Sequence, residues 1–148
     1  MQSYTVLSCL VMELYNDIRT IEENALKKGH FSNVSLTEIH TVEAIGMYET
    51  RSMSEVAKIL GITTGTLTVA VNKLVKKQYV QRIKSDRDRR VVLLKLTKEG
   101  RLLYRVHQKF HIDLIRASVE GVSEEERETL ERALERLHAY MMENYIND

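Results

Sequence analysis

The chain has 148 residues, of which 43% are hydrophobic and 29% are charged, so its length suits one domain and its composition is that of a globular protein. A single cysteine, Cys9, excludes an internal disulfide and suits a reducing compartment. The uncharged residues 1–12 are too few and too polar to span a bilayer, and they lack the basic residues of a signal peptide. We therefore expect a cytoplasmic protein without a membrane partner.

The first third of the chain predicts two helices. Apolar residues recur at alternating spacings of four and three from Leu7 to Ala25, which is typical of a helix with a nearly coiled-coil seam, and Gly29 suits its end. Residues 35–38 (Ser-Leu-Thr-Glu) have the capping-box pattern, in which the hydroxyl and the carboxylate each bind a free backbone N–H. A second helix should therefore begin there and end around Tyr48.

Two short helices follow in the middle of the chain. Residues 52–55 (Ser-Met-Ser-Glu) repeat the capping-box pattern, and Gly61 suits the end of the helix that they begin. A third helix should start near Thr64, with an inward face formed by Leu67, Val71 and Leu74. The few residues between these helices match the turn of a helix-turn-helix.

The next segment predicts a β-hairpin and then two more helices. Residues 79–84 and 91–96 have the composition of strands, and the polar residues 85–90 suit the loop that joins them. A long helix should begin at residues 97–100 and end at Gly121, and the capping-box pattern of residues 123–126 should begin the last helix.

These elements predict a mainly α fold: a winged helix-turn-helix with a two-stranded β-wing, flanked by N- and C-terminal dimerisation helices. We expect a single domain over residues 1–148, with dimerisation helices in 1–34 and 101–148 and the DNA-binding region in 35–100. The terminal helices carry apolar seams that one small domain cannot easily cover. A homodimer with twofold symmetry would cover them.

Charge is distributed unevenly along the chain. Residues 51–101 contain thirteen Lys and Arg against four Asp and Glu, although the whole chain carries a net charge of only +1. A basic middle segment suggests a double-stranded DNA partner. The candidate DNA-contacting residues lie on the third helix and in the hairpin loop: Thr63, Thr64, Gly65, Thr66, Thr68, Val69, Asn72, Lys73, Arg87, Asp88, Arg89 and Arg90. The alternatives are a merely solvated helix face and a loop in which Asp86 and Asp88 neutralise two arginines.

Two segments carry a family resemblance. Residues 88–93 (Asp-Arg-Arg-Val-Val-Leu) and 96–101 (Leu-Thr-Lys-Glu-Gly-Arg) resemble the wing signature of the MarR family of regulators. This resemblance implies that Arg90 enters the DNA minor groove, that Asp88 supports it, and that residues 64–73 read the major groove. The dimer that the apolar seams predict should bind a pseudo-palindromic operator, with half-sites about one helical turn apart.

A narrower resemblance lies outside the DNA-reading helix. Residues 21–23, 38–42, 45–46, 100–102 and 107–111, together with Phe31, are similar to the FabT-type repressors. The resemblance implies repression of fatty-acid biosynthesis genes, with long-chain acyl groups on acyl carrier protein as co-repressor. The candidate ligand-binding residues are Leu14, Ile18, Ile21, Ile39, Val42 and Phe110, and the alternative is that all six are dimer core.

The histidines and the cysteine suggest other kinds of effector. His107 and His111 are four residues apart on one helix, and with His40 they suggest a zinc-responsive regulator of metal uptake, to which Glu22, Glu23 and His30 could add ligands. A regulator that responds to another small apolar ligand is the further alternative. Cys9 has no nearby basic cluster that would activate its thiol, so a small core or interface residue is favoured over a redox sensor.

The sequence contains no pattern typical of an enzyme. It has no glycine-rich phosphate loop and no nucleophile elbow. The main interpretation therefore assigns no catalytic residue, no metal site and no cofactor.

Overall fold

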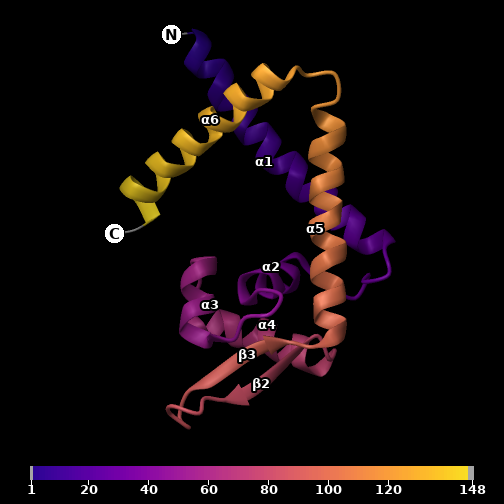
Figure 1. Cartoon of the computed structure of the whole chain (residues 1–148), viewed down its shortest axis with the longest axis vertical. Helices are drawn as coiled ribbons and strands as arrows, with labels where there is room; N and C mark the ends of the chain where they lie inside the picture. The colour runs from indigo at the N-terminus through magenta and orange to yellow at the C-terminus, as the bar shows by residue number, and fades with distance from the viewer. Residues whose placement is uncertain (1, 147–148) are drawn as a thin grey trace. The chain divides into compact units, whose positions relative to one another are not determined.

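The computed structural model describes residues 2–146, and these residues form mostly helices with one small antiparallel sheet (Figure 1). The elements in chain order are α1 (Gln2–Lys28), α2 (Leu36–Ile45), β1 (Arg51–Ser52), α3 (Met53–Leu60), α4 (Thr64–Lys76), β2 (Val80–Lys84), β3 (Val92–Leu96), α5 (Lys98–Ser118), α6 (Glu124–Met141) and a π-helical turn η1 (Met142–Ile146). The predicted winged-helix fold class is confirmed.

The chain divides into two compact units, Met1–His107 and Gln108–Asp148. The first unit contains every element from α1 to β3 and the first half of α5, and the second contains the remainder of α5, α6 and η1. Within the described residues, no helix is long and apolar enough to cross a membrane.

The hydrophobic core of the first unit lies where α2, α3 and α4 pack against the sheet. Its fully buried side chains include Ile39, Val42, Ile45, Leu67, Leu74, Leu94 and Leu96. Burying one such side chain stabilises the fold by about 1.5–3 kcal/mol relative to leaving it in water. The core therefore fixes the position of α4 against α2 and the sheet.

The sheet has three strands in the order β1-β3-β2, one more than the sequence predicted. The hairpin strands pair Val80 with Leu96 and Arg82 with Leu94, and the hairpin extends away from the helices (Figure 1). The added strand β1 has only two residues, which pair with Leu93 and Leu94 of β3. Two residues cannot show the alternation by which a strand is recognised in a sequence.

Two of the three predicted capping boxes form completely, at the starts of α3 and α6. At the start of α2, Ser35 accepts a hydrogen bond from the backbone N–H of Glu38, but the Glu38 carboxylate does not return to Ser35. It binds the ammonium group of Lys77 instead, at 2.6 Å. The predicted box at Ser35 is therefore wrong in its second half. The α2 helix ends at Ile45, three residues before the predicted end at Tyr48. The next residue, Gly46, has a φ of +89° and ends the helix.

Both terminal helices have exposed apolar side chains. On α1 these include Leu7, Leu14 and Ile21, and on α6 they include Leu130, Leu134, Leu137 and Met141. These are the seams from which the sequence predicted a dimer.

Candidate nucleic-acid interface

The turn between α3 and α4 has the geometry of a helix-turn-helix. Gly61 ends α3 in the left-handed conformation, with φ +64° and ψ +33°, which glycine adopts without steric cost. Thr63 then caps α4, because its hydroxyl oxygen accepts a hydrogen bond from the backbone N–H of Thr66 at 3.1 Å. The helix α4 is the predicted reading helix, and it begins at Thr64 as expected.

The reading helix has one buried face and one exposed face. Leu67, Ala70, Val71 and Leu74 are buried in the core, so the helix presents its opposite face to solvent. All the residues that the sequence assigned to DNA contact on this helix are exposed, including the large apolar side chain of Val69, which is 57% exposed. An exposed apolar side chain among hydroxyl and amide groups suits contact with a thymine methyl group.

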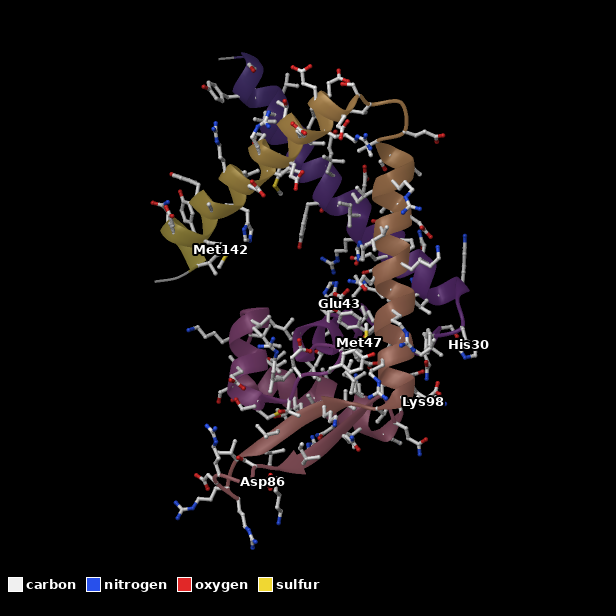
Figure 2. All side chains as sticks on the ribbon, in the orientation of Figure 1. His30, Glu43, Met47, Asp86, Lys98 and Met142 are labelled. Atoms are coloured by element: carbon white, nitrogen blue, oxygen red, sulfur yellow. The ribbon has the colours of Figure 1, made fainter. Side chains whose placement is uncertain are left out.

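The loop between β2 and β3 holds the predicted wing arginines at the end of the hairpin. The backbone of the loop is fixed at both ends, since Ser85 N–H donates to the carbonyl of Val91 at 3.0 Å and Val91 N–H donates to the carbonyl of Asp88 at 2.9 Å. Figure 2 shows Asp86 in this loop, at the end of the hairpin, with nitrogen-bearing side chains extending from the same loop into solvent.

Asp88 supports the loop through the backbone. Its Oδ1 accepts a hydrogen bond from the backbone N–H of Arg90 at 2.9 Å. The guanidinium groups of Arg87, Arg89 and Arg90 are exposed, and within the described part of the chain none of them forms an ion pair. A salt-bridged turn is therefore not what this loop forms. Its arginines keep their donors available for phosphate or groove contacts.

One side-chain contact joins the reading helix to the hairpin. The guanidinium Nη2 of Arg82, on β2, donates a hydrogen bond to Oδ1 of Asn72, on α4. Sequence reasoning singled out Asn72 but missed Arg82. The signal was present in the alternation of residues 80–84, which puts Arg82 on the same side of the strand as the buried Val80.

The candidate ligand-binding residues do not share one environment. Ile39 and Val42 are fully buried in the core, whereas Leu14 and Ile21 are exposed on α1. Ile18 lines a hollow of about 280 Å³ between α1 and α2, together with Tyr15, Arg19, Glu22, Leu36, Thr37 and His40. Phe110 belongs to the second unit.

A cluster of two histidines and two carboxylates lies beside this hollow, within the first unit. Glu22 Oε1 is 3.2 Å from His107 Nε2 and 3.7 Å from His40 Nε2, and His107 Nε2 is 3.5 Å from Glu43 Oε1. Figure 2 labels Glu43 on α2. Glu22 and His107 are buried, on α1 and α5.

Two of the other candidate ligands, Glu23 and His30, contact different residues. Glu23 Oε1 is 3.6 Å from Arg19 Nε, and the ring of His30 packs edge-on against the ring of Phe31. His111 belongs to the second unit, and Cys9 is exposed on α1.

Comparison with known proteins gives consistent matches. A sequence model of the MarR family matches residues 32–91. The crystal structure of Streptococcus pneumoniae FabT in complex with DNA is 36% identical, with a TM-score of 0.88, and the match covers 95% of this chain and 98% of that one.

Two curated relatives match over shorter segments. The HTH-type transcriptional regulator PchR of Bacillus subtilis is 26% identical over 106 residues, or 70% of this chain. The multiple antibiotic resistance protein MarR of Escherichia coli is 33% identical over 84 residues, or 56% of this chain. These matches span only 63% and 58% of the relatives' own lengths.

Proposed function

Because this chain belongs to the MarR family of winged helix-turn-helix transcriptional regulators, we propose that it represses fatty-acid biosynthesis genes, with long-chain acyl-acyl carrier protein as its co-repressor. Its fold and its relatives are those of DNA-binding regulators and not of enzymes. The observation that supports the finer assignment is the similarity to FabT over nearly the whole of both chains.

In this proposal the protein binds DNA as a homodimer. The exposed face of α4 enters the major groove, and Arg90 enters the neighbouring minor groove. The apolar side chains of α1 and α6 support dimerisation, because their burial between two chains would remove them from water. A twofold dimer implies a pseudo-palindromic operator with half-sites about one helical turn apart.

The hollow between α1 and α2 is the candidate entry for an acyl chain. Tyr15, Ile18 and Leu36 give it an apolar wall, while Arg19 and His40 supply polar groups. This mixture suits a ligand with a long apolar part and a polar attachment point. An acidic carrier protein would be attracted to basic residues of the 51–101 segment. The ligand can favour the DNA-binding arrangement only by its differential affinity for that arrangement.

Operator binding in the presence of defined ligands tests this proposal. The probe is a labelled duplex taken from a fatty-acid gene promoter, titrated with protein alone, with long-chain acyl-acyl carrier protein, and with the unloaded carrier. We expect the loaded carrier alone to tighten binding. Equal affinity in all three titrations would refute co-repression by the acyl carrier and leave the DNA-binding assignment untouched.

A zinc-responsive regulator is the second candidate, and the histidine-carboxylate cluster favours it. The ligand atoms of His40, Glu43 and His107 all lie within 4.8 Å of one another, and Glu22 lies against both histidines. Tetrahedral zinc with bonds of about 2.1 Å separates its ligand atoms by about 3.4 Å. The contacts of 3.2–3.7 Å around His107 and Glu22 are of that length. Imidazole nitrogen and carboxylate oxygen are both ordinary zinc ligands.

Calorimetric titration with Zn²⁺ distinguishes the two candidates. We expect one ion per chain if the cluster binds zinc, and His40→Ala should weaken binding about tenfold or more, because it removes one ligand. His138→Ala is the matched control, since it removes an exposed histidine from α6. Zinc binding that also changes operator affinity would support the metal-responsive function, and no heat of binding would exclude it.

A further inference from the structure

The contact between Arg82 and Asn72 lies at the junction of the reading helix and the hairpin. We propose that these two side chains form a clamp for one DNA phosphate, so that Arg82 binds the backbone and Asn72 positions the protein instead of reading a base. The inference rests on duplex DNA binding by this fold and is independent of which effector the protein senses.

The register of the hairpin explains why Arg82 reaches the reading helix. Val80 pairs with Leu96, and Arg82 pairs with Leu94, and both leucines are fully buried. Paired residues of antiparallel strands share a face of the sheet, so Arg82 lies on the core-facing side, at its edge. From there its side chain extends to α4, and its guanidinium group stays exposed beside Asn72.

The hydrogen bond also selects what the pair can bind. The amide oxygen of Asn72 faces Arg82, so the amide NH₂ group is the part of Asn72 directed away from it. An arginine has five N–H donors, and only one is used in this contact. The pair therefore offers donors to a ligand, and phosphate oxygens accept such donors. Reading adenine would require the same amide oxygen to accept a second hydrogen bond, from the base, through its remaining lone pair while it stays bonded to Arg82.

The path of a DNA duplex supports the same assignment. A protein that places a helix in the major groove and a hairpin loop in the adjacent minor groove must straddle the backbone that separates the two grooves. Arg82 lies between those two parts, because β2 connects the end of α4 to the loop that carries Arg90. A cation at that position is close to the straddled phosphates.

The test must separate a phosphate clamp from a contact that only stabilises the fold. Asn72→Asp does this, because an aspartate would keep the contact as an ion pair with Arg82 while adding a negative charge beside the phosphate. Arg82→Ala removes the clamp, and Arg82→Lys keeps the charge without the planar fork. Arg105→Ala is the control, since it removes one exposed arginine from α5. Thermal unfolding of each variant reports on the fold.

The probes are a duplex selected by the wild-type protein from a randomised pool and an unrelated duplex of equal length, each titrated over a range of salt. We expect Arg82→Ala to lower the affinity for both duplexes by the same factor. That factor should be about tenfold or more, as for loss of a charge-assisted hydrogen bond. The slope of log affinity against log salt should fall by about 0.9 for each clamp lost. Asn72→Asp should stay folded, and it should bind both duplexes at least as weakly as Arg82→Ala does.

Three results would overturn the clamp. Asn72→Asp binding as tightly as the wild type would show a purely structural contact. If a variant at Asn72 or Arg82 lost discrimination at one base pair but bound the unrelated duplex with wild-type affinity, the pair would be reading a base. An unchanged salt slope in both Arg82 variants, or a slope change matched by Arg105→Ala, would show that Arg82 does not contact a phosphate.

Discussion

Gly100, in the first turn of α5, lies directly against the backbone carbonyl of Tyr79. A Cβ atom at position 100 would stand only 2.0 Å from that oxygen. The same carbonyl accepts a hydrogen bond from the backbone N–H of Thr97 at 3.0 Å. The start of α5 is therefore held against the residue that precedes β2, and the close approach requires a residue without a side chain.

The first prediction is that Gly100→Ala destabilises the protein. Glycine to alanine inside a helix normally stabilises by up to about 1 kcal/mol. Here the backbone would have to move, so we expect a loss of at least about 2 kcal/mol in the free energy of unfolding, measured with urea. Gly65→Ala is the control, because a Cβ there would meet only the Thr63 hydroxyl, at 3.9 Å. Equal stability of Gly100→Ala and the wild type would contradict the contact.

The second prediction concerns Gln78, a non-glycine residue with a φ of +64°. It follows α4 in a Schellman arrangement, since Gln78 N–H donates to Val75 O and Tyr79 N–H donates to Leu74 O. A left-handed conformation costs a residue with a Cβ about 1 kcal/mol. Gln78→Gly should therefore stabilise the protein by about 0.5–1 kcal/mol in urea unfolding. The converse variant, Gly61→Ala, should destabilise by a similar amount, because Gly61 has the same φ and open space around it.

The third prediction concerns the ion pair between the buried Glu38 and the partly exposed Lys77. The Glu38 side chain is only 4% exposed, and Lys77 also donates to the carbonyl of Asn33. Lys77→Met leaves a buried carboxylate without its cation and should cost about 3 kcal/mol of unfolding free energy. Adding Glu38→Gln should restore most of that loss, because the buried charge is then gone. A double variant as unstable as the single one would show that the loss comes from the hydrogen bond to the Asn33 carbonyl, which both variants lack.

The fourth prediction follows from the complete capping boxes. The backbone N–H of Ser52, and then its hydroxyl, lower the pKa of Glu55 below its ordinary value of 4.5, and Ser123 lowers the pKa of Glu126 in the same way. A lowered folded-state pKa means that the stabilisation is present above pH 4.5 and is lost as the pH falls through the lowered value. Glu55→Gln should reduce the acid dependence of thermal unfolding. An identical pH profile in that variant would contradict the prediction.

The fifth prediction concerns the wing. Arg90→Ala should weaken operator binding by about 1–3 kcal/mol, as for the loss of a specifying contact, and leave the protein folded, because the side chain is exposed. Fluorescence anisotropy with a labelled operator measures the affinity, and Arg116→Ala, which removes an exposed arginine from α5, is the control. Unchanged affinity in the folded variant would remove Arg90 from the interface.

The elements that could be predicted from the sequence are those with local signals. Helix ends were predicted to within one residue at Ser52, Gly61 and Ser123. The hydrogen-bond partners of these residues are at most four positions away in the sequence, so a local pattern reports them. Glu38 was misassigned because its partner, Lys77, is 39 positions away and no local pattern reports such a pair. The alternation of residues 80–84 could place Arg82 on the core-facing side of its strand, but its contact with Asn72 depends on how the hairpin packs against α4.

Helical periodicity also cannot say which buried surface an apolar residue joins. Ile39 and Val42 lie three residues apart on one face of a helix, and that spacing is the same whether the face lines a ligand pocket or the core. The structure buries both residues in the core.

Ser52 is at once the last residue of β1 and the cap of α3. It pairs with Leu93 across the sheet and accepts a hydrogen bond from the backbone N–H of Glu55. The hairpin and the first helix of the helix-turn-helix are thus joined through one residue with no flexible segment between them. Bending between the sheet and α3 would disrupt either the pairing of Ser52 with Leu93 or the cap of α3. The strain of fitting then falls on the DNA, and base steps that deform easily would be favoured even where no side chain contacts them.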